Sequence, residues 1–270
     1  MSGERGAVNG QLVALVQGDV PFPPSVRDVF TPSIVGHDNP WLTKFTLLVW
    51  AGVAIALVLF LVAYRAPKLV PTKGQWLAES LYSFVRDGVA KEVVGHEGLR
   101  FAPYLTSLFV FILVTNIFGI IPFIQISPNA HIAFPLTLAL LSYVMYLYLG
   151  VRKHGLLKYL KLSLIPPAPI GMMPLLIPIE FFSVFVLRPL TLSLRLFANM
   201  FAGHMLLLVF TLGGFALLAA NNPLVQGISV VSWLMAIVLT FFEVLVAGLQ
   251  AYVFTVLTAS YVQGALAEDH

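Results

Sequence analysis

The chain has 270 residues, of which 59% are hydrophobic and only 10% are charged, and its mean hydropathy is +0.92. Soluble domains carry roughly a quarter charged residues, so this composition indicates an integral membrane protein. The net charge of +3 comes from Lys and Arg between apolar segments, which argues against a nucleic-acid surface. Because there is no cysteine, cysteine-based metal or redox sites are excluded, and the absence of a glycine-rich nucleotide loop argues against nucleotide chemistry in this chain. We expect no metal and no cofactor.

The first crossing follows a polar N-terminal segment. Residues 1–40 are proline-rich and aperiodic, so we predict an extramembrane segment ahead of a helical membrane domain over 41–270. Residues 45–64 form an apolar run of about the 20 residues that cross a hydrocarbon core. In the basic stretch 65–100, apolar residues recur every three or four positions, which predicts an amphipathic helix on the membrane surface. These positions are Trp76, Leu77, Leu81, Phe84 and Val85.

The next two crossings come from a long uncharged stretch. Residues 101–151 contain no Asp, Glu, Lys or Arg, and the turn-forming sequence IPFIQISPNAH divides them. We therefore predict helices over about 102–123 and 133–150. A second basic cluster follows at 152–161.

The last two apolar stretches, about 174–218 and 224–263, are too long for ordinary crossings. Forty helical residues span about 60 Å, whereas the hydrocarbon core is roughly 30 Å thick. Because modest tilt cannot absorb this difference, we predict a strongly tilted, hairpin-like pair lying against a large partner surface. The predicted fold is therefore all-α and polytopic, with five membrane crossings and two long ion-channel helices.

Loop charges orient these crossings. The loops at 65–100 and 152–161 are basic, whereas those near 125–131 and 219–223 carry no Lys or Arg. The positive-inside rule then places the N-terminus outside and the C-terminus in the cytoplasm.

Few charged residues occur in the last two predicted helices. A charge at bilayer depth is costly and marks a functional position unless it is paired. Arg195 is the hardest to explain by packing, because no carboxylate lies near it in the sequence. Between Leu162 and Ala267 the formally charged residues are Glu180, Arg188, Arg195 and Glu243, accompanied by the titratable His204.

Helical periodicity distributes the polar residues into two patches. At 100° per residue, Arg195 and Asn199 share one face with Thr191, whereas His204 points to the opposite side. On the last helix, Glu243, Gln250 and Tyr261 return to one face. The pattern predicts polar patches at two depths with a permanent cation between them. Structural alternatives stay open for several of these residues: Arg188 as an interface anchor, Asn199 and Gln250 as interhelical hydrogen-bond partners, and His204 as a packing residue.

Three segments resemble a known family. The segments LRLFANMFAGH at 194–204, LQAYVFTVLTASYV at 249–262 and VTNIFGIIPF at 114–123 are similar to subunit a of the F-type ATP synthase, and the likeness covers nearly everything after residue 40. The resemblance implies a stator subunit without a catalytic site of its own, in a bacterial cell membrane. Its implied partners are a ring of c subunits, the b subunits of the peripheral stalk, the F1 sector indirectly and the lipid bilayer, with no nucleic acid.

The resemblance also implies roles for individual residues. Arg195 matches the essential arginine that separates two aqueous half-channels, and Gln250 matches its partner glutamine. Two further positions, His204 and Glu243, are those where the family uses a carboxylate and a histidine in either order. The inlet half-channel would contain Asn199, His204 and Glu243, and the outlet half-channel Glu180 and Ser183. Two departures from the family pattern are Gly119, where some members carry an acidic residue, and His131, where Asp is common.

Two other functions are considered. An ion-coupled secondary transporter also contains buried charges and broken helices, but it predicts an internal repeat and helices of normal span length. A purely structural membrane subunit would tolerate the loss of Arg195 and Glu243.

Overall fold

The computed structural model describes residues 43–65, 71–121, 127–164, 172–219 and 222–267. The predicted N-terminal segment, 1–40, lies outside this part of the chain. The described residues form helices and connecting turns without any strand, in agreement with the predicted all-α class. The helices are α3 (Lys44–Arg65), α4 (Lys73–Val85), η1 (Arg86–Val94), η2 (His96–Phe101), α5 (Ala102–Ile117), η3 (Pro128–Ala130), α6 (Ala133–His154), α7 (Leu156–Leu164), α8 (Met173–Phe182), η5 (Ser183–Leu187), α9 (Arg188–Leu218) and α10 (Pro223–Leu266).

Five helical segments of the described chain are long and apolar enough to cross a membrane, which confirms the predicted number of crossings. The third corresponds to α6, and the fifth to α10. The fourth combines α8, η5 and α9 into one path of 46 residues. The segments are Lys44–Leu61, His96–Ile117, Ala133–His154, Met173–Leu218 and Pro223–Leu266.

The amphipathic helix α4 buries a different face from the one that its largest apolar residues suggest. Thr72 caps its first turn by accepting a hydrogen bond from the backbone N–H of Gln75. Ala78 and Val85 are buried, while Trp76, Leu77 and Phe84 are exposed. Small residues allow close approach to α3 and α5, and the bulky ones remain on the outer surface, where a membrane protein meets lipid.

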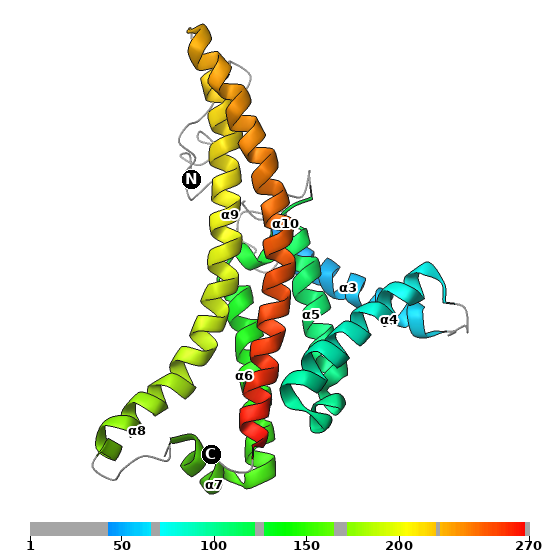
Figure 1. Ribbon diagram of the computed structural model, residues 1–270, viewed down its shortest axis with the longest axis vertical. Coiled ribbons are helices and arrows are strands. Elements are labelled where there is room, and N and C mark those ends of the chain that lie inside the picture. The colour runs from blue at the N-terminus through cyan, green and yellow to red at the C-terminus, as the bar shows by residue number, and fades with distance from the viewer. Residues whose placement is uncertain (1–42, 66–70, 122–126, 165–171, 220–221, 268–270) are drawn as a thin grey trace.

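The two long C-terminal helices form the predicted hairpin. Figure 1 shows α9 and α10 side by side and antiparallel, with α8 bending away at the lower end of α9. Close contact depends on small residues of α9: the Trp233 indole lies directly against Gly214. The Ser232 hydroxyl donates to the Phe210 carbonyl at 2.7 Å, which links the helices near their joined end. Tilt relative to a bilayer stays a prediction.

The hydrophobic core lies around the C-terminal half of α10, where α5, α6 and η1 pack against it. Phe254, Ala259 and Val262 are buried there. By contrast, the half of α10 that begins at Pro223 carries mostly exposed apolar side chains, including Leu224, Ile228 and Phe241. Such a large exposed apolar surface is typical of contact with lipid or with another membrane subunit.

Candidate functional site

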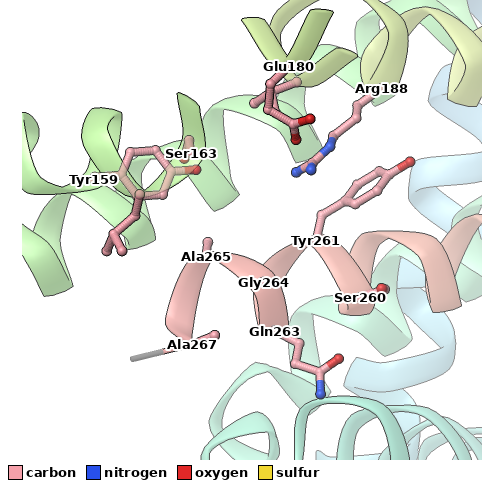
Figure 2. Close-up of a pocket in the computed structure, with 12 residues that line it drawn as sticks. Tyr159, Ser163, Glu180, Arg188, Ser260, Tyr261, Gln263, Gly264, Ala265 and Ala267 are labelled. Carbon is pink, nitrogen blue, oxygen red and sulfur yellow. The ribbon is translucent and has the colours of Figure 1, made fainter. Parts of the chain in front are cut away.

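A large cavity lies at the end of the molecule where α10 ends. Its volume is about 730 Å³, and its walls come from α7, α8, η5, the start of α9 and the last turns of α10. We call it the Glu180 cavity. Figure 2 shows the Glu180 carboxylate and the Arg188 guanidinium turned toward one another beside the ring of Tyr261. The lining residues are Tyr159, Leu162, Ser163, Glu180, Val184, Arg188, Ser260, Tyr261, Gln263, Gly264, Ala265 and Ala267.

Arg188 is held in this cavity by aromatic rings rather than by a carboxylate. Its guanidinium carbon lies 5.3 Å from the centre of the Tyr261 ring, within the range of a cation–π contact. The Tyr261 ring in turn lies 5.7 Å from that of the buried Tyr146. Because the ion pairs among the described residues involve only Arg86–Asp87, Arg100–Glu97 and Lys153–Glu97, Arg188 keeps its charge available to the cavity.

A second, much smaller cavity brings together His204 of α9 and Glu243 of α10. Its volume is about 10 Å³, roughly the space of a single water molecule. We call it the Glu243 cavity. Both side chains are half-buried, so an acid and an imidazole share one confined space. The lining residues are Asn116, Gly119, Ile120, Ser127, Met200, His204 and Glu243.

The backbone of α9 comes close to Glu243 at Gly203. A Cβ atom added at Gly203 would collide with Oε1 of Glu243 and crowd its Cγ and Cδ atoms. Glycine at this position therefore leaves the space that the Glu243 carboxylate occupies, next to His204. The contact fixes the carboxylate against α9 at the level of the small cavity.

A network of buried side-chain amides closes the Glu243 cavity on the side of α5. Asn116 Nδ2 donates to the carbonyl of Ala247, one helical turn beyond Glu243, at 3.3 Å. Asn129 Nδ2 donates to Asn116 Oδ1 at 2.7 Å and to Thr115 Oγ1 at 2.9 Å. Both asparagines are almost completely buried. The network ties α5, η3 and α10 together around the cavity.

Arg195 lies on α9 between the two cavities. It is seven residues beyond Arg188 and nine before His204, or about 10 Å and 14 Å along the helix axis. Its side chain is exposed, next to the exposed Leu194, and no carboxylate of the described residues forms an ion pair with it. An exposed cation on an apolar helix surface indicates a partner from outside this chain.

The remaining predicted site residues differ in burial, and none of them lines either cavity. Gln250 is buried on α10, and Asn199 is half-buried on α9 without lining either cavity. The half-buried Ser183 begins η5, and the serine that lines the Glu180 cavity from α7 is Ser163. Sequence reasoning missed Ser163 because it follows the basic cluster at 152–161, far in the sequence from the charged residues of the last helices.

Of the two positions that depart from the family pattern, Gly119 lines a cavity and His131 does not. Gly119 lines the Glu243 cavity, so an acidic side chain at this position would enter it. His131 packs against the rings of Phe45 and Phe134, with centroids 5.8 Å and 6.1 Å away, and does not line the cavity. Asn116 was missed as a site residue, although an asparagine within an apolar crossing was a visible signal.

Comparison with known proteins gives consistent matches. A family model described as ATP synthase A chain matches residues 46–263. The chain is 39% identical over 270 residues to an ATP synthase subunit a of Nocardioides sp., covering 96% of this chain and 98% of the relative. It is 42% identical over 260 residues to that of Rhodococcus erythropolis, covering 92% and 91%. For the Frankia alni protein the identity is 43% over 262 residues, covering 94% and 90%.

Proposed function

This chain belongs to the ATP synthase A chain family, and on that premise we propose that it is the membrane stator subunit of a rotary, proton-translocating ATP synthase. It is a multi-pass helical membrane protein that works in a complex with other ATP synthase subunits. Its own part is proton transfer, since the chemistry of ATP belongs to other subunits. The ion-coupled secondary transporter is not favoured, because the family match spans all five crossings.

The observation that carries the proposal is the separation of two polar cavities by an exposed arginine. The Glu243 cavity serves as the inlet, with Asn199 next to the lining residue Met200 on α9, and the Glu180 cavity serves as the outlet, with Ser183 next to the lining residue Val184. Along α9 the two cavities lie 16 residues apart between Arg188 and His204, which is about 24 Å of helix. A proton crosses this gap only on a moving carrier, namely a ring of c subunits with one membrane carboxylate each.

Neutralisation controls the movement of that carrier. A protonated ring carboxylate faces lipid without a large desolvation cost, whereas the ionised form cannot. Protons arriving through His204 and Glu243 neutralise a ring carboxylate, which then travels with the ring. It releases its proton after nearly a full turn, beside Glu180.

Arg195 separates inlet from outlet by its charge. A guanidinium stays protonated at any workable pH, so it attracts the ionised ring carboxylate and repels a proton that approaches without a carrier. Gln250, on the adjacent helix, assists as a polar neighbour. Each proton carries roughly 2.3 kcal/mol per 100 mV, so a direct leak between the cavities would dissipate the driving force.

The predicted topology determines the side of the membrane on which the outlet opens. With the N-terminus outside and the C-terminus in the cytoplasm, the Glu180 cavity opens to the cytoplasm because the last residues of α10 line it. Basic residues occupy the last turn of α6 and continue into α7 on the same side, as Arg152, Lys153, Lys158 and Lys161. The b subunits and, through them, the F1 sector complete the stator in a bacterial cell membrane.

Photo-crosslinking tests whether a ring lies against this surface. A photoreactive amino acid at Leu249, an exposed residue of α10, is expected to crosslink to a small two-helix subunit in native membranes. The matched control is Ala251, which is buried two residues later on the same helix. Crosslinking at neither position, or equally at both, would contradict the ring as partner of this face.

A further inference from the structure

A π-turn interrupts the helical path between Glu180 and Arg188. In η5 the backbone N–H of Arg188 donates to the carbonyl of Ser183, five residues earlier instead of four. The cause lies in the next residue, Pro189, which has no N–H and whose ring clashes with the carbonyl four residues before it. A regular α-helix therefore cannot run through this point unchanged.

The π-turn leaves the carbonyl of Val184 without a donor from its own helix. The residue four positions later, Arg188, donates to Ser183, and the residue five positions later is Pro189. Instead, the hydroxyl of Tyr146 on α6 donates to this carbonyl at 3.4 Å. Because Tyr146 is only 2% exposed, packing holds its hydroxyl at that position. The sequence and the packing thus stabilise the turn from two sides.

The wider turn changes which side of the helix Glu180 faces. Glu180 and Arg188 are eight residues apart, which in a regular α-helix places them roughly 80° apart around the axis. A π-turn absorbs one residue, so the effective separation becomes seven residues and the angle falls to about 20°. Figure 2 shows the two charged groups on the same side, within one cavity.

We propose that the π-turn of η5, held by Tyr146 and Pro189, is the register element that turns Glu180 toward Arg188 and into the Glu180 cavity. Tyr146 is a positioning residue, since its hydroxyl donates to the backbone of the turn and also interacts with the Arg188 side chain, while it does not line the cavity itself. The importance of Glu180 for proton release rests on the proposed function, whereas its orientation does not.

Two length variants test the register directly. Deletion of Val186, an exposed residue that does not line the cavity, removes the extra residue of the π-turn, so that the Arg188 N–H reaches the Ser183 carbonyl four residues earlier and Glu180 keeps its direction. Insertion of one alanine after Val186 adds a second extra residue and rotates Glu180 by about 100°. Because the chain contains no cysteine, Glu180→Cys provides a unique reporter on this chain.

The measurement is the rate at which a water-soluble maleimide labels that cysteine in the intact complex in native membranes. We expect the deletion to leave the labelling rate within about twofold of that of Glu180→Cys in a chain of natural length. We expect the insertion to lower this rate about tenfold, because only the insertion turns the side chain out of the cavity. Equal losses in both length variants would overturn the proposal. So would assembly of the complex with the insertion but not with the deletion.

A second measurement uses the chain at its natural length. Ile179→Cys lies next to the reporter, on an exposed position that does not line the cavity, and is expected to react much more slowly than Glu180→Cys. Equal rates at both positions would overturn the orientation, even if neither length variant assembles.

These labelling results are independent of proton transfer. If Glu180→Gln pumps protons normally while the labelling pattern holds, the outlet role of Glu180 fails and the register element stands. The reverse outcome, loss of pumping in Glu180→Gln together with equal labelling at 179 and 180, removes the register element and leaves the outlet role.

Discussion

The two cavities differ in size by more than an order of magnitude, and the difference indicates two ways of moving protons. The Glu180 cavity has about 730 Å³ and admits many water molecules, whereas the Glu243 cavity has about 10 Å³ and holds about one. Under the proposed function, water would carry protons in the larger cavity and side chains would adjust the local charge. In the smaller one, transfer depends on the positions of His204 and Glu243 themselves.

This difference predicts where substitutions matter. A wide, water-filled space tolerates the loss of one polar group because water replaces it. A space for one water molecule offers no such replacement, and small displacements interrupt the path. Arg195 belongs to neither cavity, so its loss removes the separation between them.

The largest effect is expected at Arg195. Arg195→Ala removes the fixed charge between the cavities and should abolish ATP-driven proton pumping. Arg195→Lys should do the same, because a lysine is compact and loses its proton readily when buried. Acidification of inverted membrane vesicles, followed by quenching of a pH-sensitive dye, measures the effect. Leu194→Ala, at an exposed neighbouring position, serves as the control. Pumping retained by either arginine variant would remove Arg195 from the role of separator.

The next largest effect compares the two carboxylates directly. Glu243→Gln should lower the pumping rate by about tenfold or more, whereas Glu180→Gln should lower it only a few-fold, because water in the larger cavity compensates. The same vesicle assay, normalised to the amount of assembled complex, gives both rates. A larger loss in the Glu180 variant would reverse the comparison between the cavities.

Gly203→Ala tests how tightly the small cavity is built. The added methyl group collides with the Glu243 carboxylate, so we expect pumping to fall several-fold although no ionisable group changes. Gly227→Ala on α10 is the matched control, since no atom lies within 4 Å of the position that its new Cβ would occupy. Identical pumping in both variants would show that the Glu243 carboxylate has room to move.

Much of the fold could be predicted from the sequence because membrane constraints act locally. An apolar run of about 20 residues indicates a membrane crossing, and the five predicted crossings are present. Helical periodicity also predicted that His204 and Arg195 point to opposite sides, and they do: one lines a cavity and the other is exposed. The roles assigned to these residues stay predictions.

Other features depend on contacts between distant segments and could not be predicted. Asn116 and Asn129 are 13 residues apart, and their pairing depends on how the turn at η3 folds back onto α5. The outward face of α4 was ambiguous, because in a membrane large apolar residues such as Trp76 are equally stable against protein or lipid. The stretch predicted over about 174–218 gave no sign of the π-turn, which the hydrogen bond from the Arg188 N–H to the Ser183 carbonyl reveals.

The amide network provides a prediction for stability rather than for proton transfer. Asn129→Ala leaves Asn116 Oδ1 and Thr115 Oγ1 without their buried donor, which costs about 1–3 kcal/mol. We expect the purified complex to lose this subunit at a lower temperature, and pumping at moderate temperature to fall by less than in Gly203→Ala. The control is Thr137→Ala, which removes an exposed hydroxyl bonded only to its own helix. Equal thermal stability of both variants would mean that water replaces the lost donor.

The smallest effect is expected at Tyr146, on the side of the larger cavity. Tyr146→Phe keeps the packed ring and removes only the hydroxyl that donates to the Val184 carbonyl, a change of about 1 kcal/mol. Pro189 still prevents a regular helix, so the π-turn persists and pumping should fall less than twofold. The deletion of Val186 would not restore a donor to the Val184 carbonyl, because Pro189 then lies four residues after Val184 and has no N–H, so the missing hydroxyl should have the same small effect with and without Val186. A loss of pumping in Tyr146→Phe larger than that in Glu180→Gln would show that the hydroxyl acts on Arg188 or on the cavity itself, and not through the hydrogen bond to Val184.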